Sequence, residues 1–306
     1  MNKLVTKKNL HKIFIMIVII VIAIFALIPV NKKYEPVEWM EALSDNTKIN
    51  DMTIPGTHDS GATHSIFDVS GKCQDIDIET QLNIGVRFFD IRLKLVNDEF
   101  VIVHSFVDQD LKLREILNTF NEFITTHSKE FLIISFKEDA SPKNSTLDFS
   151  EALVNTLKEY DKFVFANDLP KTLKDARGKI YILNRFSSNG VGIEASSGWK
   201  DSTSFVLGSM YIQDNYSIDD IETKKQDIIN TFDYALNNDK LILNFTSCYL
   251  NVPFPPTYAG TSANAINKWL KEYIDENDIN GIVIIDFATE ELIKKIYMEN
   301  TYEENK

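Results

Sequence analysis

Two short stretches decide the fold: Pro55-Gly56-Thr57-His58-Asp59-Ser60 and Phe89-Asp90-Ile91-Arg92. Each contains titratable side chains and lies at the end of an apolar run. A third run, Phe100-Val101-Ile102-Val103, ends directly on His104. We interpret the three runs as buried strands that deliver polar groups at their carboxyl ends. Alternating strand–helix folds build their active sites at that end of the strands.

Strand and helix patterns alternate along the rest of the chain. The strand candidates are mostly apolar at odd and even positions alike, which is typical of a parallel sheet covered on both faces. They lie at residues 51–54, 86–91, 100–104, 131–136, 179–184, about 205–213, 240–245 and 281–286. Helical patterns lie at residues 112–127, 148–160, 217–238, 262–277 and 288–298. Eight strands in one domain predict an α/β fold, a single distorted (β/α)8 barrel of the TIM type, irregular where the link between 86–91 and 100–104 is too short for a helix.

Polar side chains follow each of the eight strand candidates. They are His58 with Asp59, Asp90 with Arg92, His104, Lys137 with Glu138, Arg185, Asp214, Ser247 and Asp286. Chance would scatter such groups, so their alignment at one rim predicts an active site there, even where a strand boundary is off by a few residues. A base, an acid and a fixed cation suit acid–base chemistry on a phosphate.

The two histidines at strand ends are the candidate catalytic base and acid. One removes a proton from the nucleophile, and the other protonates the leaving oxygen. Arg92 would hold the non-bridging oxygens of the phosphate. Asp90 and Asp286 would fix histidine tautomers and stabilise the imidazolium. A structural ion pair lining the barrel is the alternative interpretation of Asp90 and Arg92.

The N-terminus differs from the rest of the chain. Four lysines precede an uncharged, apolar run of 18 residues from Ile13 to Val30, and Lys32 and Lys33 follow it. This pattern is typical of a secretory signal peptide or a membrane anchor, and both alternatives stay open. We expect residues 1–33 to be that leader and residues 34–306 to be a catalytic barrel. The positive-inside rule predicts that the barrel is secreted or anchored at the outer face of the cell membrane.

The body of the protein is strongly acidic. Residues 1–33 hold six lysines and no acidic residue, so residues 34–306 carry 26 basic against 45 acidic side chains, a net charge of −19. Such a body is repelled by nucleic acid and gains nothing from anionic lipid surfaces. Docking on a membrane would therefore depend on apolar or aromatic side chains. Strong acidity is equally consistent with a role in solubility alone.

The chain has two cysteines, Cys73 and Cys248. Export would permit a disulfide between them, but the sequence does not say whether their geometry allows one. Neither belongs to a Cys-x-x-Cys or His/Cys spacing, so we expect no structural zinc. We also expect no cofactor.

The stretch Pro-Gly-Thr-His-Asp-Ser-Gly, then Phe-Asp-Ile-Arg, then a strand that ends in histidine resembles the bacterial phosphatidylinositol-specific phospholipase C family of the X-domain type. The resemblance runs from about Trp39 to Asp286, with further matches at Ile-Ser-Phe-Lys137, at Arg185 and at Gln213-Asp214-Asn215-Tyr216. It implies a distorted (β/α)8 barrel that cleaves the phosphodiester of phosphatidylinositol without a metal.

The resemblance also implies roles for the catalytic positions. His58 would deprotonate the inositol 2-hydroxyl, which attacks phosphorus, and His104 would protonate the departing diacylglycerol. The product would be inositol 1,2-cyclic phosphate, which the same residues later hydrolyse slowly. Arg92 would contact the phosphate and the 2-hydroxyl, Asp286 would pair with His58, and Asp59 would support His104.

For the substrate, the resemblance implies that Lys137, Arg185 and Asp214 bind inositol hydroxyls and that Tyr216 packs on the ring face. Calcium-dependent relatives have acidic ligands near the position of Arg92, so a cation supplied by the protein argues for metal independence. One departure is Ser105, which stands where the family often has glycine.

Membrane docking in the family uses aromatic side chains at the rim. The candidates here are Phe67, Tyr249, Phe254 and Tyr258, and their packing onto the barrel is the alternative. We expect a monomer that meets an inositol lipid at a membrane surface and binds no nucleic acid.

Three functions are compatible with these observations. The leading hypothesis is a phosphatidylinositol-specific phospholipase C of the lyase type. The second is a phosphodiesterase with the same machinery that acts on glycosylated inositol lipid anchors or on another phosphodiester. The third is a non-catalytic lipid- or sugar-binding barrel, which loss of either histidine would have favoured.

Overall fold

The structure is a computed structural model that describes residues 35–64, 71–105, 107–186, 190–251 and 259–302. These residues form an α/β fold on one sheet of 12 strands, with a two-stranded sheet of β11 (Ser217–Ile218) and β13 (Tyr249–Leu250) beside it. The predicted leader at residues 1–33 lies outside them. Among the helices of this part of the chain, none is both long and apolar enough to cross a membrane.

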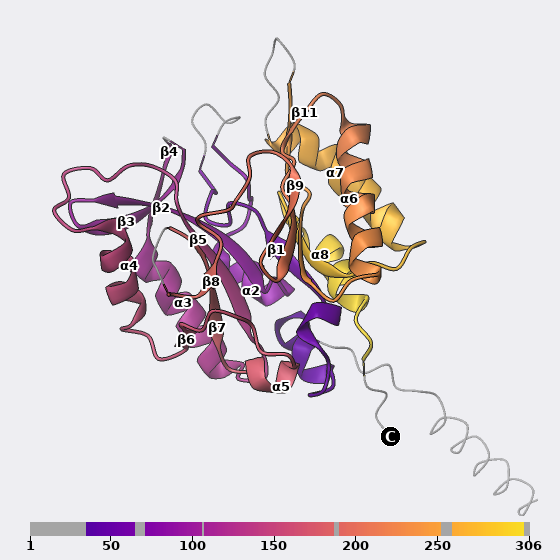
Figure 1. Ribbon diagram of the computed structural model, residues 1–306, viewed down its shortest axis with the longest axis horizontal. Coiled ribbons are helices and arrows are strands. Elements are labelled where there is room, and N and C mark those ends of the chain that lie inside the picture. The colour runs from indigo at the N-terminus through magenta and orange to yellow at the C-terminus, as the bar shows by residue number, and fades with distance from the viewer. Residues whose placement is uncertain (1–34, 65–70, 106, 187–189, 252–258, 303–306) are drawn as a thin grey trace, which may run out of the picture. The chain divides into compact units, whose positions relative to one another are not determined.

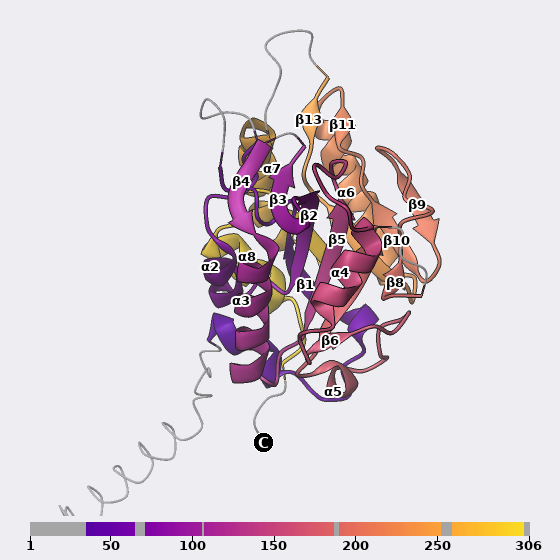
Figure 2. The same cartoon turned by 90° about the vertical axis from the view of Figure 1, so that its left-hand side faces the viewer.

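Parallel strands make up the centre of the sheet, and helices flank it (Figures 1 and 2). Their order is β6 (Phe163–Val164), β7 (Ile180–Arg185), β5 (Leu132–Glu138), β2 (Phe88–Val96), β1 (Thr53–Thr57), β14 (Gly281–Ile285), β12 (Leu241–Phe245) and β10 (Met210–Gln213), and β8 (Ile193–Glu194) also pairs with β7. The helices are α2 (Ile78–Ile84), α3 (Leu113–Thr126), α4 (Phe149–Leu157), α5 (Leu173–Ala176), α6 (Ile221–Leu236), α7 (Ala259–Ile274) and α8 (Glu290–Met298), with short 3₁₀ turns η1 (Pro36–Ala42) and η2 (Ile49–Asp51) before β1.

The sheet curls but does not close into the predicted (β/α)8 barrel. Its last strand, β9 (Ser204–Leu207), runs antiparallel to β10, and no strand pairing within the described residues joins β9 to β6 or β8 at the other end. The segment at residues 205–213, predicted as one strand, is this β9–β10 hairpin. It turns at Gly208, whose φ of +56° suits glycine. An antiparallel strand at this edge ends the parallel series, so the sheet stays open.

The third predicted strand also differs, because it is not a parallel strand of a barrel. β3 (Glu99–His104) turns back antiparallel to β2 through Asn97 and Asp98, both with positive φ, and β4 (Val107–Lys112) follows antiparallel to β3. Asparagine and aspartate tolerate this left-handed conformation better than most residues. His104 therefore reaches the rim by returning along β2.

The predicted helices are confirmed, with shifted ends for two of them. The helix predicted at residues 262–277 is α7 (Ala259–Ile274), which begins and ends three residues earlier, and the helix predicted at residues 217–238 is shorter at its start. Residues 217–218 form β11 instead, and α6 begins after Asp220, whose carboxylate accepts a hydrogen bond from the backbone N–H of Thr223. Asp77 and Asp148 cap α2 and α4 in the same way. Such caps satisfy backbone donors that a helix start leaves without partners.

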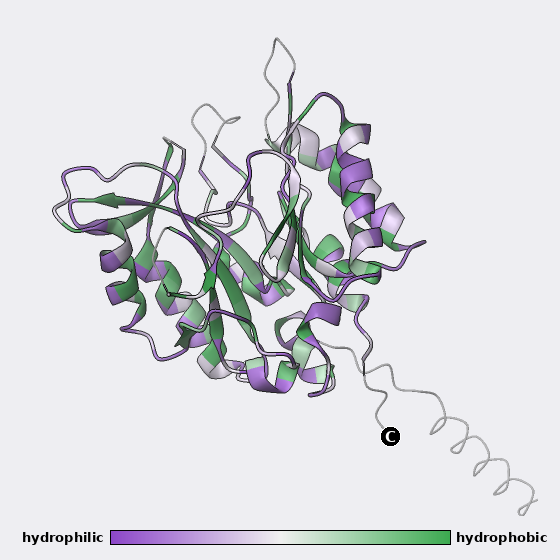
Figure 3. Cartoon of the chain, in the orientation of Figure 1, coloured by the Kyte–Doolittle hydropathy of each residue, from purple (hydrophilic) through white to green (hydrophobic). Residues whose placement is uncertain are grey.

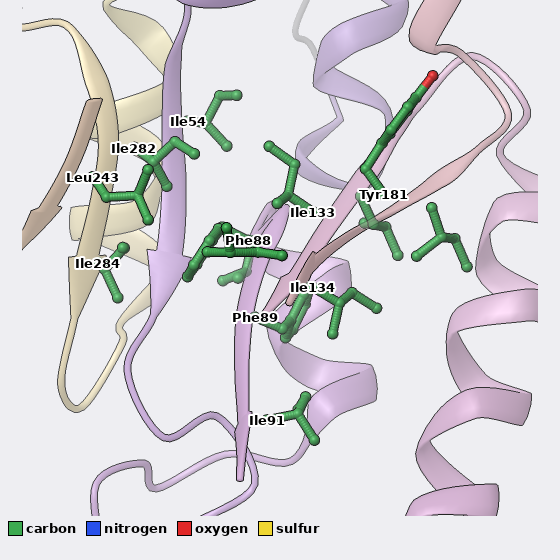
Figure 4. Close-up of a cluster of buried hydrophobic side chains, with 14 of the residues drawn as sticks. Ile54, Phe88, Phe89, Ile91, Ile133, Ile134, Tyr181, Leu243, Ile282 and Ile284 are labelled. Atoms are coloured by element: carbon green, nitrogen blue, oxygen red, sulfur yellow. The ribbon is translucent and has the colours of Figure 1, made fainter. Parts of the chain in front are cut away.

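Buried aliphatic and aromatic side chains from neighbouring strands form the core. Figure 4 labels Ile54, Phe88, Phe89, Ile91, Ile133, Ile134, Tyr181, Leu243, Ile282 and Ile284. A side chain at Gly56 would place its Cβ 3.0 Å from the Phe88 side chain, so the first motif needs glycine for close packing. In Figure 3 the strands are mainly green, that is, hydrophobic. The helices carry purple, hydrophilic patches, which is typical of helices with one face in water.

Candidate active site

A cavity of about 450 Å³ opens at the carboxyl ends of the parallel strands. Eight of the ten predicted site residues line it: His58, Arg92, His104, Lys137, Arg185, Asp214, Tyr216 and Asp286. The other two, Asp59 and Asp90, are fully buried next to Arg92. The strands thus bring together residues that are up to about 230 positions apart, as His58 and Asp286 are.

His58 has a partner at each ring nitrogen. Its Nδ1 lies 2.8 Å from Oδ1 of Asp286, and its Nε2 lies 2.7 Å from Nη2 of Arg92. A guanidinium only donates, so Nε2 accepts and the Nδ1–H donates to Asp286. Burial lowers the pKa of His58, but the Asp286 carboxylate outweighs burial and the pKa is raised. The geometry defines a neutral imidazole whose basic atom is Nε2.

Gln74 holds the backbone that carries His58. Its side-chain amide donates to the carbonyl oxygens of His58 (2.9 Å) and Ile285 (3.0 Å), and its oxygen accepts from the N–H of Ala288 (3.0 Å). These bonds join the ends of β1 and β14, from which His58 and Asp286 project. Gln74 was not predicted from the sequence, because a glutamine in a loop belongs to no recognisable pattern.

Arg92 lies among three carboxylates. Its Nε and Nη2 are each 3.2 Å from Oδ2 of Asp90, its Nε is 3.4 Å from Oδ2 of Asp59, and its Nη1 is 3.8 Å from Oδ1 of Asp139. Burial would raise the pKa of Asp90, but Arg92 and Arg185 outweigh it and hold that pKa well below its usual range. Burial likewise disfavours the charge of Arg92, but Asp59 and Asp90 raise its pKa well above the usual value. The guanidinium therefore stays charged at the bottom of the cavity.

His104 lines the same cavity, beside Asp59. Its Nε2 is 3.6 Å from Oδ2 of Asp59, and its Nδ1 is buried without a hydrogen-bond partner. Asp59 is fully buried, and neither of its carboxylate oxygens accepts a hydrogen bond. Burial raises the pKa of Asp59, against the opposing effect of Arg92. The pair has unused hydrogen-bonding capacity, unlike His58 and Asp286.

Asp139 is a further cavity residue that was not predicted from the sequence. One of its oxygens lies 2.6 Å from Nζ of Lys137, and the other accepts from the N–H of Ser105 at 2.8 Å. Ser105 has a φ of +54°, so this bond fixes a turn directly after His104. The spacing of Asp139 and Lys137, two residues apart at the end of β5, was the signal that could have identified it.

The polar wall of the cavity consists of Arg185, Asp214 and Tyr216. The guanidinium of Arg185 lies 3.7 Å from the ring centroid of Trp199, and the indole N–H of Trp199 donates to Asp214 at 2.8 Å. The hydroxyl of Tyr216 donates to Asp201. Trp199 also escaped prediction, because it lies in a loop between short strands. Aromatic and charged groups in this arrangement suit a ring with several hydroxyls.

The site contains a neutral histidine beside a carboxylate, a second histidine beside another carboxylate, and a guanidinium between them. This set supplies a base, an acid and fixed positive charge in one cavity. Fold and site together define an α/β protein whose cavity holds the groups that acid–base chemistry on an anionic group would need.

Known proteins match the chain closely enough to give its family. The family model described as Phosphatidylinositol-specific phospholipase C, X domain, matches residues 52–186. A 1-phosphatidylinositol phosphodiesterase of Listeria monocytogenes is 29% identical over 286 residues, which cover 90% of this chain and 88% of the relative. A protein of the same name from Staphylococcus aureus is 30% identical over 279 residues, which cover 83% of this chain and 88% of the relative.

Solved structures agree with the sequence matches. A phosphatidylinositol-specific phospholipase C from S. aureus matches with a TM-score of 0.79 at 25% identity, over 88% of this chain and 98% of that one. The enzyme of the same type from L. monocytogenes matches with a TM-score of 0.72 at 26% identity, over 88% and 100%. The chain therefore belongs to the bacterial phosphatidylinositol-specific phospholipase C family, as its motifs predicted.

Proposed function

We propose that the protein cleaves phosphatidylinositol into diacylglycerol and inositol 1,2-cyclic phosphate, by attack of the inositol 2-hydroxyl on phosphorus. The observation that carries the proposal is that His58 and His104 line one cavity, where Arg92 lies 2.7 Å from His58 and 3.4 Å from Asp59, the neighbour of His104. The family supplies the substrate, since its curated members bear the name 1-phosphatidylinositol phosphodiesterase.

His58 is the general base. Its Nε2 carries the lone pair, and Asp286 accepts the Nδ1–H at 2.8 Å, so the imidazole is held in the tautomer that takes a proton from a hydroxyl. When Nε2 takes the proton of the 2-hydroxyl, the imidazolium forms beside the Asp286 carboxylate. That carboxylate stabilises the new charge without itself becoming protonated.

His104 is the general acid. It gives its proton to the diacylglycerol oxygen as the P–O bond breaks, and Asp59 at 3.6 Å supports the protonated form before transfer. Arg92 binds the non-bridging oxygens, where negative charge grows as the 2-oxygen attacks. Asp90 keeps that guanidinium in place. The protein thus supplies the positive charge from its own side chains, and the reaction requires no metal ion.

The polar wall selects the inositol ring. Lys137, Arg185 and Asp214 bind ring hydroxyls, and Tyr216 packs against the ring face. Trp199 contacts both Arg185 and Asp214, so replacing this tryptophan would displace two of the side chains that bind the ring hydroxyls.

The lipid is met at a membrane surface outside the cell, by a monomer. Tyr249, 42% exposed, lies at the cavity and contacts the ring of Tyr216 at 5.8 Å, which supports a role at the lipid-facing rim. The other aromatic candidates, Phe67, Phe254 and Tyr258, lie outside the described residues. Two structures of the S. aureus relative carry titles on the modulation of its membrane binding. Export and the monomeric state remain predictions from the sequence.

Phosphorus NMR tests the proposal directly. The purified protein is incubated with phosphatidylinositol micelles in excess chelator, and a cyclic inositol phosphate signal is expected. That product establishes substrate, intramolecular attack and metal independence together. Product only after calcium addition would overturn the role of Arg92. No product in either condition would shift the function to another phosphodiester or to lipid binding without catalysis.

Histidine variants provide the controls. His58→Ala and His104→Ala should each lose about 10²–10⁴-fold in turnover, because each removes one proton transfer. His127→Ala changes a histidine that pairs with Glu38 far from the cavity and should retain full turnover. Near-normal turnover in either active-site variant would contradict the acid–base assignment.

A further inference from the structure

Cys73 is a cavity residue without a task in the proposed reaction. It is almost fully buried, is not disulfide-bonded, and lines the same cavity as the two histidines. Its backbone is fixed at both ends, because its N–H donates to the carbonyl of Ala62 and its carbonyl accepts from Phe287. The sulfur is therefore held in a defined place.

The sulfur of Cys73 belongs to two groups of metal-binding atoms. With Asp59 and His104 it forms one set whose ligand atoms all lie within 4.8 Å of one another, and with His58 and Asp286 it forms another. The two sets differ in whether their ligand atoms already have hydrogen-bond partners. Both ring nitrogens of His58 have partners, whereas the carboxylate of Asp59 and Nδ1 of His104 are buried without hydrogen bonds.

We propose that Asp59, Cys73 and His104 form an inhibitory site for Zn²⁺. A thiolate, an imidazole and a carboxylate make up a donor set that suits zinc, and three protein ligands leave a fourth position for water. Ligands on one zinc lie roughly 3.5 Å apart, given bonds of about 2.0–2.3 Å. The 3.6 Å between Oδ2 of Asp59 and Nε2 of His104 already has this spacing, and the sulfur of Cys73 lies within 4.8 Å of a ligand atom of each.

The charges around the site tolerate a divalent cation. Five carboxylates lie in or beside the cavity, and four cationic side chains oppose them. The carboxylates belong to Asp59, Asp90, Asp139, Asp214 and Asp286, and the cations to Lys72, Arg92, Lys137 and Arg185. Arg92 is the nearest opposing charge, at 3.4 Å from Asp59, and it competes with zinc for that carboxylate.

Zinc at this site would stop the reaction. A ring nitrogen of His104 bound to zinc no longer carries the proton for the leaving oxygen, and Asp59 no longer supports it. Binding also releases the thiol proton of Cys73, since the thiolate is the ligand. The inhibitory effect rests on the proposed acid role of His104, but the binding of metal does not.

Cobalt(II) tests the binding independently of activity. A thiolate bound to cobalt gives a charge-transfer band in the near ultraviolet, so the full-length protein titrated with Co²⁺ should show this band, and added Zn²⁺ should remove it. Cys73→Ser should abolish the band. Cys248→Ser is the matched control, because Cys248 is the other buried thiol in the cavity, and it should keep the band.

Two carboxylate variants distinguish the two sets of ligands, and they also serve if Cys73→Ser does not fold. Asp59→Asn should weaken cobalt binding at least tenfold, whereas Asp286→Asn should leave it within a few-fold. The reverse order would place the metal on His58 instead. Absence of a thiolate band in the wild-type protein would overturn the site.

Inhibition is measured against each variant's own activity in chelator. Zn²⁺ should inhibit the wild-type protein and the Cys248→Ser variant at similar concentrations, and the Cys73→Ser variant only at concentrations at least tenfold higher. Equal sensitivity of Cys73→Ser would overturn the proposal. A cobalt band without zinc inhibition of an active enzyme would refute the inhibitory role alone. If the protein does not cleave phosphatidylinositol, the cobalt band still decides whether the metal site exists.

Discussion

Arg92 is the residue through which the two histidine pairs contact each other. It lies 2.7 Å from Nε2 of His58 and 3.4 Å from Asp59, the partner of His104. Its planar fork reaches a histidine and two carboxylates at once, which a single ammonium group does not do. The two halves of the acid–base machinery therefore share one cation.

Replacement of Arg92 by lysine should lower turnover by about 10²-fold or more, the usual cost of losing a fixed donor to developing charge. The measurement is kcat on phosphatidylinositol micelles in chelator. Arg114→Lys is the matched control, because Arg114 forms a bidentate pair with Glu159 at the surface and should leave kcat unchanged. A kcat within a few-fold of wild type in Arg92→Lys would remove the arginine from the mechanism.

The pair of His58 and Asp286 predicts a pH effect with a definite sign. Asp286 raises the pKa of His58, and a general base acts only in its neutral form, so kcat/KM falls as pH drops through this raised pKa. Asp286→Asn removes the anion, so the pKa of His58 should fall and the acidic limb of the profile should move to lower pH. Turnover should fall as well, because the tautomer is no longer fixed. An acidic limb that stays in place or moves upward would show that another group controls it.

At the scale of the secondary-structure elements, a buried ion pair between Arg87 and Glu130 links η1 and α2 to the start of β2. Arg87 and Glu130 are both fully buried, with 2.8 Å between Nε and Oε2, and Arg87 also donates to the carbonyl oxygens of Val37, Leu82 and Val86. Burial raises the pKa of Glu130 despite its partner Arg87. The pair lies before the start of β2, away from the carboxyl ends that carry the site.

Glu130→Ala should lower the free energy of unfolding by about 3–5 kcal/mol, because it leaves a buried guanidinium without its counter-charge. Urea unfolding followed by circular dichroism measures the change. Glu159→Ala removes the partner of an exposed arginine instead and should change the unfolding midpoint little. A loss in Glu130→Ala no greater than in this control would show that water or nearby groups compensate for the missing carboxylate.

The sequence predicted these elements unevenly, for physical reasons. Apolar periodicity located the central strands and the long helices, and the positions after the strands located His58, Arg92 and Asp286. The direction of β3 was predicted wrongly, because an apolar run does not say whether its neighbour is parallel. The turn at Asn97 and Asp98 was the available signal for a hairpin.

Site residues that act through loops were the hardest to predict. Gln74 and Trp199 contact the predicted residues through hydrogen bonds or ring stacking, and these contacts exist only once distant segments meet. No local periodicity encodes such meetings. Cys73 is a similar case, because its proximity to two histidines comes from the loop between β1 and α2.

At the scale of the whole molecule, the open curled sheet and the net charge bear on how the protein meets a membrane. Tyr249 lines the cavity, so we expect the substrate to enter past this residue. Residues 34–306 carry a net charge of −19. Repulsion from an anionic surface therefore opposes any attraction through exposed aromatic side chains.

This opposition predicts an unusual lipid dependence. With the phosphatidylinositol content of vesicles held constant, replacing phosphatidylcholine by anionic phosphatidylglycerol should lower the fraction of protein lacking residues 1–33 that sediments with the vesicles. Added salt should restore binding, because screening acts over about 10 Å at 0.1 M ionic strength and weakens charge repulsion more than apolar contact. Tyr249→Ala should reduce binding to the vesicles without phosphatidylglycerol at every salt concentration. Tighter binding to anionic vesicles, weakened by salt, would instead require a local basic surface that dominates the net charge.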